Sequence, residues 1–137
     1  MFTDMEREYL ASQPLGRLAT VSEVGLPQNN PVGFAFNEIA GTIDIGGQAM
    51  GATRKFANVA ATRVAALVVD DLVSRDPWTV RGIEIRGRAE AIRGLDPIAP
   101  FAGGEIIRIF PIRIISWGLD PDRPAMHGRT VSVSEAA

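Results

Sequence analysis

Two short stretches of the chain have the residue spacing of an amphipathic helix. Residues 3–12 begin with Thr3, and Glu6 follows three positions later, which is the spacing of a capping box. Residues 52–62 place apolar side chains three and four positions apart. The pattern therefore predicts two short helices, the first of which ends at Pro14.

Strand patterns fill most of the remaining chain. The expected strands are residues 16–23, 29–37, 42–48, 64–72, 80–93 and 105–119. Pro31 places the second of these at a sheet edge or a bulge. The run 64–72 is apolar at almost every position, which is typical of a strand buried on both faces. Pro111 marks a bend in the last segment, which is either one bent strand or a pair of strands.

About six strands, two short helices and mostly short connections favour a mostly β protein. Because strands and helices do not alternate, a small antiparallel barrel is favoured over a Rossmann fold. A length of 137 residues is typical of one domain. We assign residues 1–120 to that domain. Residues 121–137 lack a periodic pattern and are expected to be a tail, ordered only against a partner.

The composition removes several classes of chemistry. The chain has no cysteine and a single histidine, His127, so zinc sites rich in these residues are excluded. Asp70 and Asp71 are more typical of solvated strand ends than of a metal site, and we expect no metal.

A net charge of −2 without a dense basic run argues against nucleic-acid binding. No apolar run approaches the roughly 20 residues of a membrane span, and the acidic N-terminus does not resemble a signal peptide, so a cytoplasmic location is expected.

The segment GGQAMGATRKFANV, residues 46–59, contains the only lysine of the chain, Lys55. Gly46 and Gly47 end a predicted strand and would let a flat ligand come close. Thr53 can cap the helix that follows.

Arg54 and Lys55 then lie in the first helical turn, where exposed N–H groups and the helix dipole favour an anion. Asn58 follows one turn after Arg54 and would donate to the same ligand. The alternative is that both cations are ordinary solvated surface charges.

These motifs resemble the pyridoxamine-phosphate-oxidase-like split barrels, also called flavin/deazaflavin oxidoreductases. Thr53-Arg54-Lys55 matches the Ser/Thr-Arg-Lys phosphate motif of that family. The segments NNPVGF (29–34), IDIGG (43–47) and RGIEIRG (81–87) match its strands. The resemblance covers residues 5–120. It implies a six-stranded antiparallel split barrel with short helices, forming a homodimer with cofactor sites at the interface.

Within this family, TIDIGG, RKF-x-NV and EIIRIFPIRIISWGL are most similar to the branch that uses the deazaflavin coenzyme F420. That branch implies hydride transfer from reduced deazaflavin to an electron-poor conjugated alkene, enone or quinone. Gly82 stands where oxidase-type members carry Gln, and Gln48 where the branch often has His. The alternatives are an FMN-binding oxidoreductase of the same fold and a flavin or deazaflavin carrier without turnover.

The resemblance also implies a set of cofactor-binding residues. The set comprises Asn30, Pro31, Val32, Gly46, Gly47, Thr53, Arg54, Lys55, Asn58, Trp78, Arg81 and Trp117. Asn30 is equally compatible with a plain strand, Arg81 with a cross-strand charge and Trp117 with a core or interface anchor. Arg123 and Arg129 are expected to reach the carboxylate tail of the coenzyme or simply to solubilise the chain, and His127 to be exposed. No catalytic residue is assigned.

Overall fold

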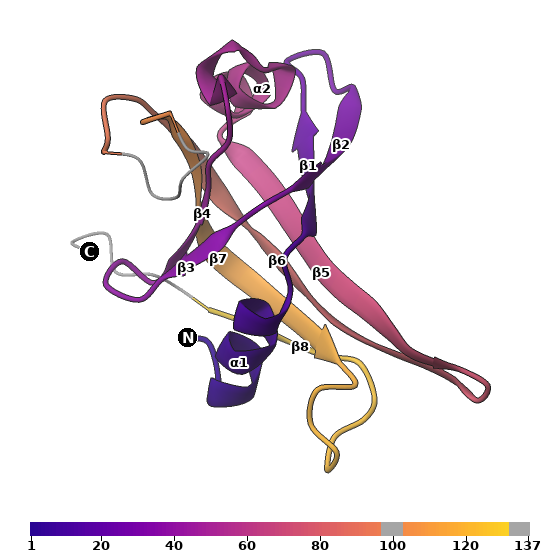
Figure 1. Ribbon diagram of the computed structural model, residues 1–137. Coiled ribbons are helices and arrows are strands. Elements are labelled where there is room, and N and C mark those ends of the chain that lie inside the picture. The colour runs from indigo at the N-terminus through magenta and orange to yellow at the C-terminus, as the bar shows by residue number, and fades with distance from the viewer. Residues whose placement is uncertain (97–102, 132–137) are drawn as a thin grey trace.

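The computed structural model describes residues 1–96 and 103–131. Strands dominate it, and the helices lie at two ends of the sheet (Figure 1). The elements are α1 (Asp4–Ser12), β1 (Gly16–Val21), β2 (Pro27–Val32), β3 (Ala35–Asn37), β4 (Thr42–Ile45), the 3₁₀ helix η1 (Met50–Ala52), α2 (Arg54–Thr62), β5 (Val64–Arg75), β6 (Trp78–Ile92), β7 (Ile106–Trp117) and β8 (His127–Thr130). Within the described ranges, no helix has the length and apolar character that crossing a membrane requires.

The strands form one antiparallel sheet in the order β2-β1-β5-β6-β7-β4-β3, with β8 added beside β7. The expected antiparallel, mostly β architecture is confirmed, with eight strands in the described part of the chain where six were expected. The segment expected as one strand over 29–37 is two, because β2 pairs with β1 whereas β3 pairs with β4. Pro31 lies in β2, at the edge of the sheet, as predicted.

The tail contains a strand that the sequence pattern does not reveal. β4 pairs with β7 only over Ile107–Ile109, so the second half of β7 has an open edge. β8 occupies that edge, with Ser116 opposite His127 and Arg113 opposite Thr130. The expectation that the tail is ordered only against a partner is therefore wrong for residues 127–130. The reason is that its partner lies in the same chain.

The core lies between the curved faces of the sheet and is built from alternating positions. Leu18, Leu67, Ile83, Ile85 and Ile114 are all fully buried. In β5 the burial alternates, and Val64 is 47% exposed. The expectation that residues 64–72 are buried on both faces is therefore wrong for a single chain, because no element among the described residues covers the outer face.

Pro111 bends a single strand, which decides between the two alternatives left open for residues 105–119. The register of β6 against β7 shifts between Arg86 and Gly87, opposite Pro111. Gly87 lies directly against the carbonyl group of Phe110, where a Cβ atom would clash. Glycine at this position therefore lets the two strands remain paired through the bend.

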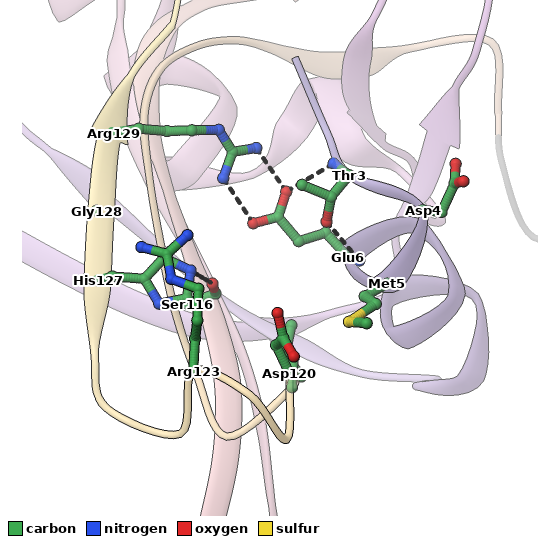
Figure 2. A pocket seen from close by; sticks show the side chains of 11 residues that line it. Thr3, Asp4, Met5, Glu6, Ser116, Asp120, Arg123, His127, Gly128 and Arg129 are labelled. Carbon is green, nitrogen blue, oxygen red and sulfur yellow. Dashed lines mark hydrogen bonds and ion pairs between the residues drawn. The ribbon is translucent and has the colours of Figure 1, made fainter.

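Glu6 joins the two ends of the described chain. The capping box of α1 is present as predicted: Thr3 accepts from the Glu6 backbone, and Glu6 accepts from the Thr3 backbone. The buried Glu6 carboxylate also accepts two bonds from Arg129 in β8, at 2.9 and 2.6 Å (Figure 2). Arg129 is thus committed to an internal ion pair, which differs from both roles expected for it.

The environment of Glu6 makes this ion pair dependent on pH. Burial raises the pKa of Glu6, but the bonds from Arg129 and Thr3 lower it by more, so the pKa lies below its ordinary 4.5. A carboxylate whose pKa is lower in the folded than in the unfolded state stabilises the fold at pH values above its pKa in the unfolded state. This stabilisation is lost as the pH falls through its pKa in the folded state.

Replacing Glu6 with Gln should lower the free energy of unfolding near neutral pH by about 2–3 kcal/mol, because Arg129 loses the anion that it binds. Wild type and variant should converge as the pH falls below 4.5, where the carboxylate of the wild type becomes protonated. Urea denaturation at several pH values measures both effects. The control is Glu8→Gln, on the exposed face of the same helix, and an equal loss in the two variants would contradict the assignment.

Candidate functional site

A cavity of about 440 Å³ lies where β2, the segment after β4 and the start of α2 meet. Figure 1 shows α2 at the end of the molecule opposite α1, beside β1 and β2. Six of the residues predicted to bind the cofactor line this cavity: Pro31, Val32, Gly46, Gly47, Thr53 and Lys55. These residues come from three separate parts of the sequence, and the fold brings them together.

Thr53 fixes the amino-terminal end of α2 at the cavity. Its hydroxyl accepts from the backbone N–H of Phe56 at 3.2 Å and donates to the carbonyl of Met50 at 2.7 Å. The predicted cap is therefore present, one residue before the helix begins. The N–H groups of the first turn have no carbonyl partner within the helix, so this end carries partial positive charge.

Lys55 is the cation that lines the cavity. Its side chain is partly buried, whereas Arg54 is exposed and lies outside the cavity lining. No Asp or Glu lines the cavity among the residues that the structure describes. The cavity thus brings together the ammonium group of Lys55, the amino terminus of α2 and the backbone of Gly46 and Gly47. These groups fit an anionic ligand group such as a phosphate.

Asn58 lies inside the protein rather than toward the cavity. It is only 4% exposed, and its amide nitrogen donates to Thr20 of β1 at 3.1 Å and to Gln28 of β2 at 3.3 Å. Gln28 in turn donates to Asn30 at 2.8 Å. Asn58 was expected to share a ligand with Arg54, but its side chain is directed into the protein. Asn58 and Asn30 belong to a hydrogen-bond network that holds α2 on the sheet.

Arg81 is also engaged within the protein. Its guanidinium donates two bonds to Asp71, at 2.8 and 3.2 Å, and lies 5.0 Å from the ring of Tyr9. The bond to Asp71 raises the pKa of Arg81. Burial raises the pKa of Tyr9, and its hydrogen bond to Asp71 raises it further. The cluster therefore anchors α1 to β5 and β6.

The two tryptophans lie outside the cavity lining. Trp117 ends β7 and packs over Gly82 of the neighbouring strand, where an added Cβ would lie 2.5 Å from the indole. Trp78 is the first residue of β6 and is 72% exposed. Leu72, Val73 and Val80 are exposed beside it on the hairpin that β5 and β6 form.

Sequence reasoning missed part of the lining. Pro14, Leu15, Gly33 and Met50 contribute to the cavity, and Gln48 lies at it as well. Most of these residues lie between regular elements, where periodicity carries no signal. The exposure of Leu15, at 51%, marks it as an apolar side chain available to a ligand. The described part of the chain contains no cluster of three or more metal-binding side chains.

The motifs and the cavity agree with comparisons to known proteins. The profile of the pyridoxamine 5'-phosphate oxidase family matches residues 2–131. The chain belongs to this family. A 5a,11a-dehydrotetracycline/5a,11a-dehydrooxytetracycline reductase of Streptomyces rimosus, a curated relative, is 44% identical over 136 residues, which are 98% of this chain and 96% of that protein.

Solved structures support the fold assigned to this family member. A heme-binding protein of Mycobacterium smegmatis superposes with a TM-score of 0.67 at 15% identity, over 95% of this chain but only 59% of that protein. An FAD-binding protein of the same organism gives a TM-score of 0.60 at 17% identity, over 95% of this chain and 98% of that one. At such identities the likeness concerns the fold alone, and it confirms the split barrel.

Replacing Asn58 with Ala should lower the free energy of unfolding by about 1–3 kcal/mol, because Thr20 and Gln28 lose a buried partner. Thermal denaturation followed by circular dichroism measures the loss. Asn29→Ala, at an exposed position of β2, is the matched control and should leave stability nearly unchanged. Equal stability of Asn58→Ala and wild type would show that the network does not hold α2.

Proposed function

We propose that this protein is an F420-dependent reductase acting on electron-poor conjugated alkenes, enones or quinones. The observation that carries the proposal is the cavity in which Lys55, the amino terminus of α2 and the Gly46–Gly47 backbone meet. The same phosphate site would serve FMN, which is the alternative cofactor. Enzyme activity, rather than cofactor carriage, is supported by the reductase that is 44% identical to the chain.

The name of that relative also supports the substrate class. The prefix in 5a,11a-dehydrotetracycline denotes a compound that lacks two hydrogens at these positions, so its reductase adds hydrogen across that bond. A conjugated double bond is the kind of acceptor that a hydride donor reduces. We propose that the present protein also reduces conjugated double bonds, without assigning it the substrate of that relative.

The chain supplies binding and positioning. Lys55 would hold the phosphate as a point charge, and the first turn of α2 would donate backbone N–H groups to it. Arg54, exposed at the same turn, would reach the phosphate from the rim. Gly46 and Gly47 leave room for a flat ring system against the backbone. Reduced F420, when bound, supplies a hydride.

The remaining lining suits a reaction that needs no acid or base from the protein. Pro14, Leu15, Pro31 and Val32 form an apolar wall that would exclude water from the reacting atoms. Gln48 is a neutral polar side chain at this wall. The protein would hold the acceptor carbon of the substrate close to the hydride donor. This positioning lowers the entropic part of the activation barrier for hydride transfer. We expect this chemistry in the cytoplasm.

We also propose a homodimer with the cofactor sites at its interface. An apolar surface groove of about 550 Å³ runs across β1, β5, β6 and β7 and includes Val21, Val64, Ala66 and Ile112. Ile112 is 51% exposed in the single chain. A second copy would cover this face, and the exposed Trp78 of the β5–β6 hairpin would then be available to the neighbouring cofactor site.

Replacing both Arg54 and Lys55 with Ala should weaken cofactor binding by at least about tenfold, because two charge-assisted contacts to the phosphate are lost. Fluorescence titration with F420, and separately with FMN, measures the affinity. The control is Arg7→Ala, an exposed position of α1 at the end of the molecule opposite α2.

Unchanged F420 affinity in the double variant would refute the phosphate site. Binding of FMN alone would refute the F420 assignment and leave the FMN enzyme. If F420 binds but its reduced form is not oxidised by any member of a panel of enones and quinones, the protein is a carrier.

Sedimentation equilibrium should give twice the mass of one chain for the wild type and a single chain for Ile112→Glu, because a carboxylate on this face would be desolvated in the dimer. Ile39→Glu, at a position that is 98% exposed in the β3–β4 turn, is the matched control and should remain dimeric. A dimeric Ile112→Glu variant would place the interface elsewhere.

A further inference from the structure

A second cavity, of about 400 Å³, lies at the end of the molecule that carries α1, and it shares no residue with the cavity at Lys55. Its walls are the first turn of α1, the end of β7 with the loop that follows, and β8 (Figure 2). The fold therefore brings both ends of the described chain to one small hollow. The function proposed above gives it no role.

One side of this cavity, on α1, carries the exposed Asp4, which pairs with Arg7, and a buried ion pair. Glu6 and Arg129 face each other there, and the two bonds from Arg129 together with the backbone N–H of Thr3 occupy the carboxylate. Neither charge is available to a ligand without breaking a buried ion pair. This side is a wall, and not the group that would recognise a ligand.

A second wall presents Ser116 and His127, which lie opposite each other on β7 and β8. His127 Nδ1 is 3.2 Å from the carbonyl oxygen of Ala125, and a carbonyl oxygen only accepts, so Nδ1 carries the hydrogen. In the neutral ring Nε2 is then an acceptor, and Ser116, whose Oγ is 3.3 Å away, donates to it. The donors of this wall are thus already used within the protein.

Arg123 is different. It lines the cavity from the loop between β7 and β8, and its guanidinium has no carboxylate partner within 4.0 Å among the residues that the structure describes. Asp120 lies in the same loop and accepts the backbone N–H of Asp122 at 2.9 Å. Figure 2 shows both side chains reaching from this loop toward the wall formed by Glu6 and Arg129.

We propose that this cavity binds a small organic acid, with the carboxylate held by the guanidinium of Arg123 and the apolar part against Met5 and Leu119. The planar fork of Arg matches a carboxylate through two parallel N–H bonds. Met5 is 46% exposed and flexible, so it adapts to the shape of an apolar group. The negative charge of Asp120 repels the carboxylate and weakens its binding, whereas the positive charge of Arg123 strengthens it.

The test uses benzoate as the acid, with benzamide and benzylamine as neutral and cationic probes of similar shape. His127 is the only histidine, so its ring resonances in an NMR spectrum are a single local reporter. Benzoate should shift them in a saturable way, with a dissociation constant on the order of 1 mM. Benzamide and benzylamine should bind at least about tenfold more weakly, because neither is an anion.

Two variants with opposite expected effects separate recognition from general surface charge. Arg123→Gln should weaken benzoate binding at least about tenfold, and Asp120→Asn should strengthen it severalfold while keeping an acceptor for Asp122. Arg75→Gln is the matched control and should leave it unchanged. Lys55→Ala should also leave it unchanged, so failure of the cofactor assignment and failure of this one are distinguishable.

The absence of a saturable shift at His127 would overturn the proposal. Equal binding of benzoate and benzylamine, or benzoate binding that Arg123→Gln does not weaken, would overturn it as well. Weaker binding in Asp120→Asn would also overturn it, because Asp120 would then support the ligand rather than repel it.

Discussion

The position of α2 on the sheet is the constraint on which the candidate site depends. Phe56 and Val59 bury the apolar face of the helix, and Asn58 ties the same face to β1 and β2. Because the helix is held at its middle, the placement of its amino terminus at the end of β4 is fixed. Lys55 then reaches the cavity from a rigid turn, as a site with a preformed geometry requires.

The distribution of charge separates the arginines held in internal ion pairs from the lysine that lines the candidate cofactor cavity. All ion pairs found among the described residues use arginine, and the most buried of them join Asp44 to Arg108 and Glu6 to Arg129. The bonds to Asp44 raise the pKa of Arg108 by more than burial lowers it. Lys55, in contrast, lies at a cavity with no acidic side chain in its described lining. Arginine suits paired, bidentate contacts, whereas lysine supplies a point charge on a flexible stem.

The sequence predicts features that depend on neighbouring residues. The capping box at Thr3 and Glu6, the cap at Thr53 and the alternation of Ile83 and Ile85 are all local, and the structure contains them. What the pattern does not contain is the identity of distant partners. β8 exists because half of β7 has an open edge, and Arg81 is occupied because Asp71 lies on the neighbouring strand. Asn58 belongs to the same group, since its partners lie 30 and 38 positions away.

The proposed binding site for the phosphate of a deazaflavin consists of Lys55 and the amino terminus of α2. A crystal structure of the protein with F420 tests this most directly. We expect the phosphate within hydrogen-bond distance of Lys55 Nζ and the backbone N–H groups of the first turn of α2, with the ring system against Gly46 and Gly47. A phosphate bound elsewhere, with this corner filled by solvent, would contradict it.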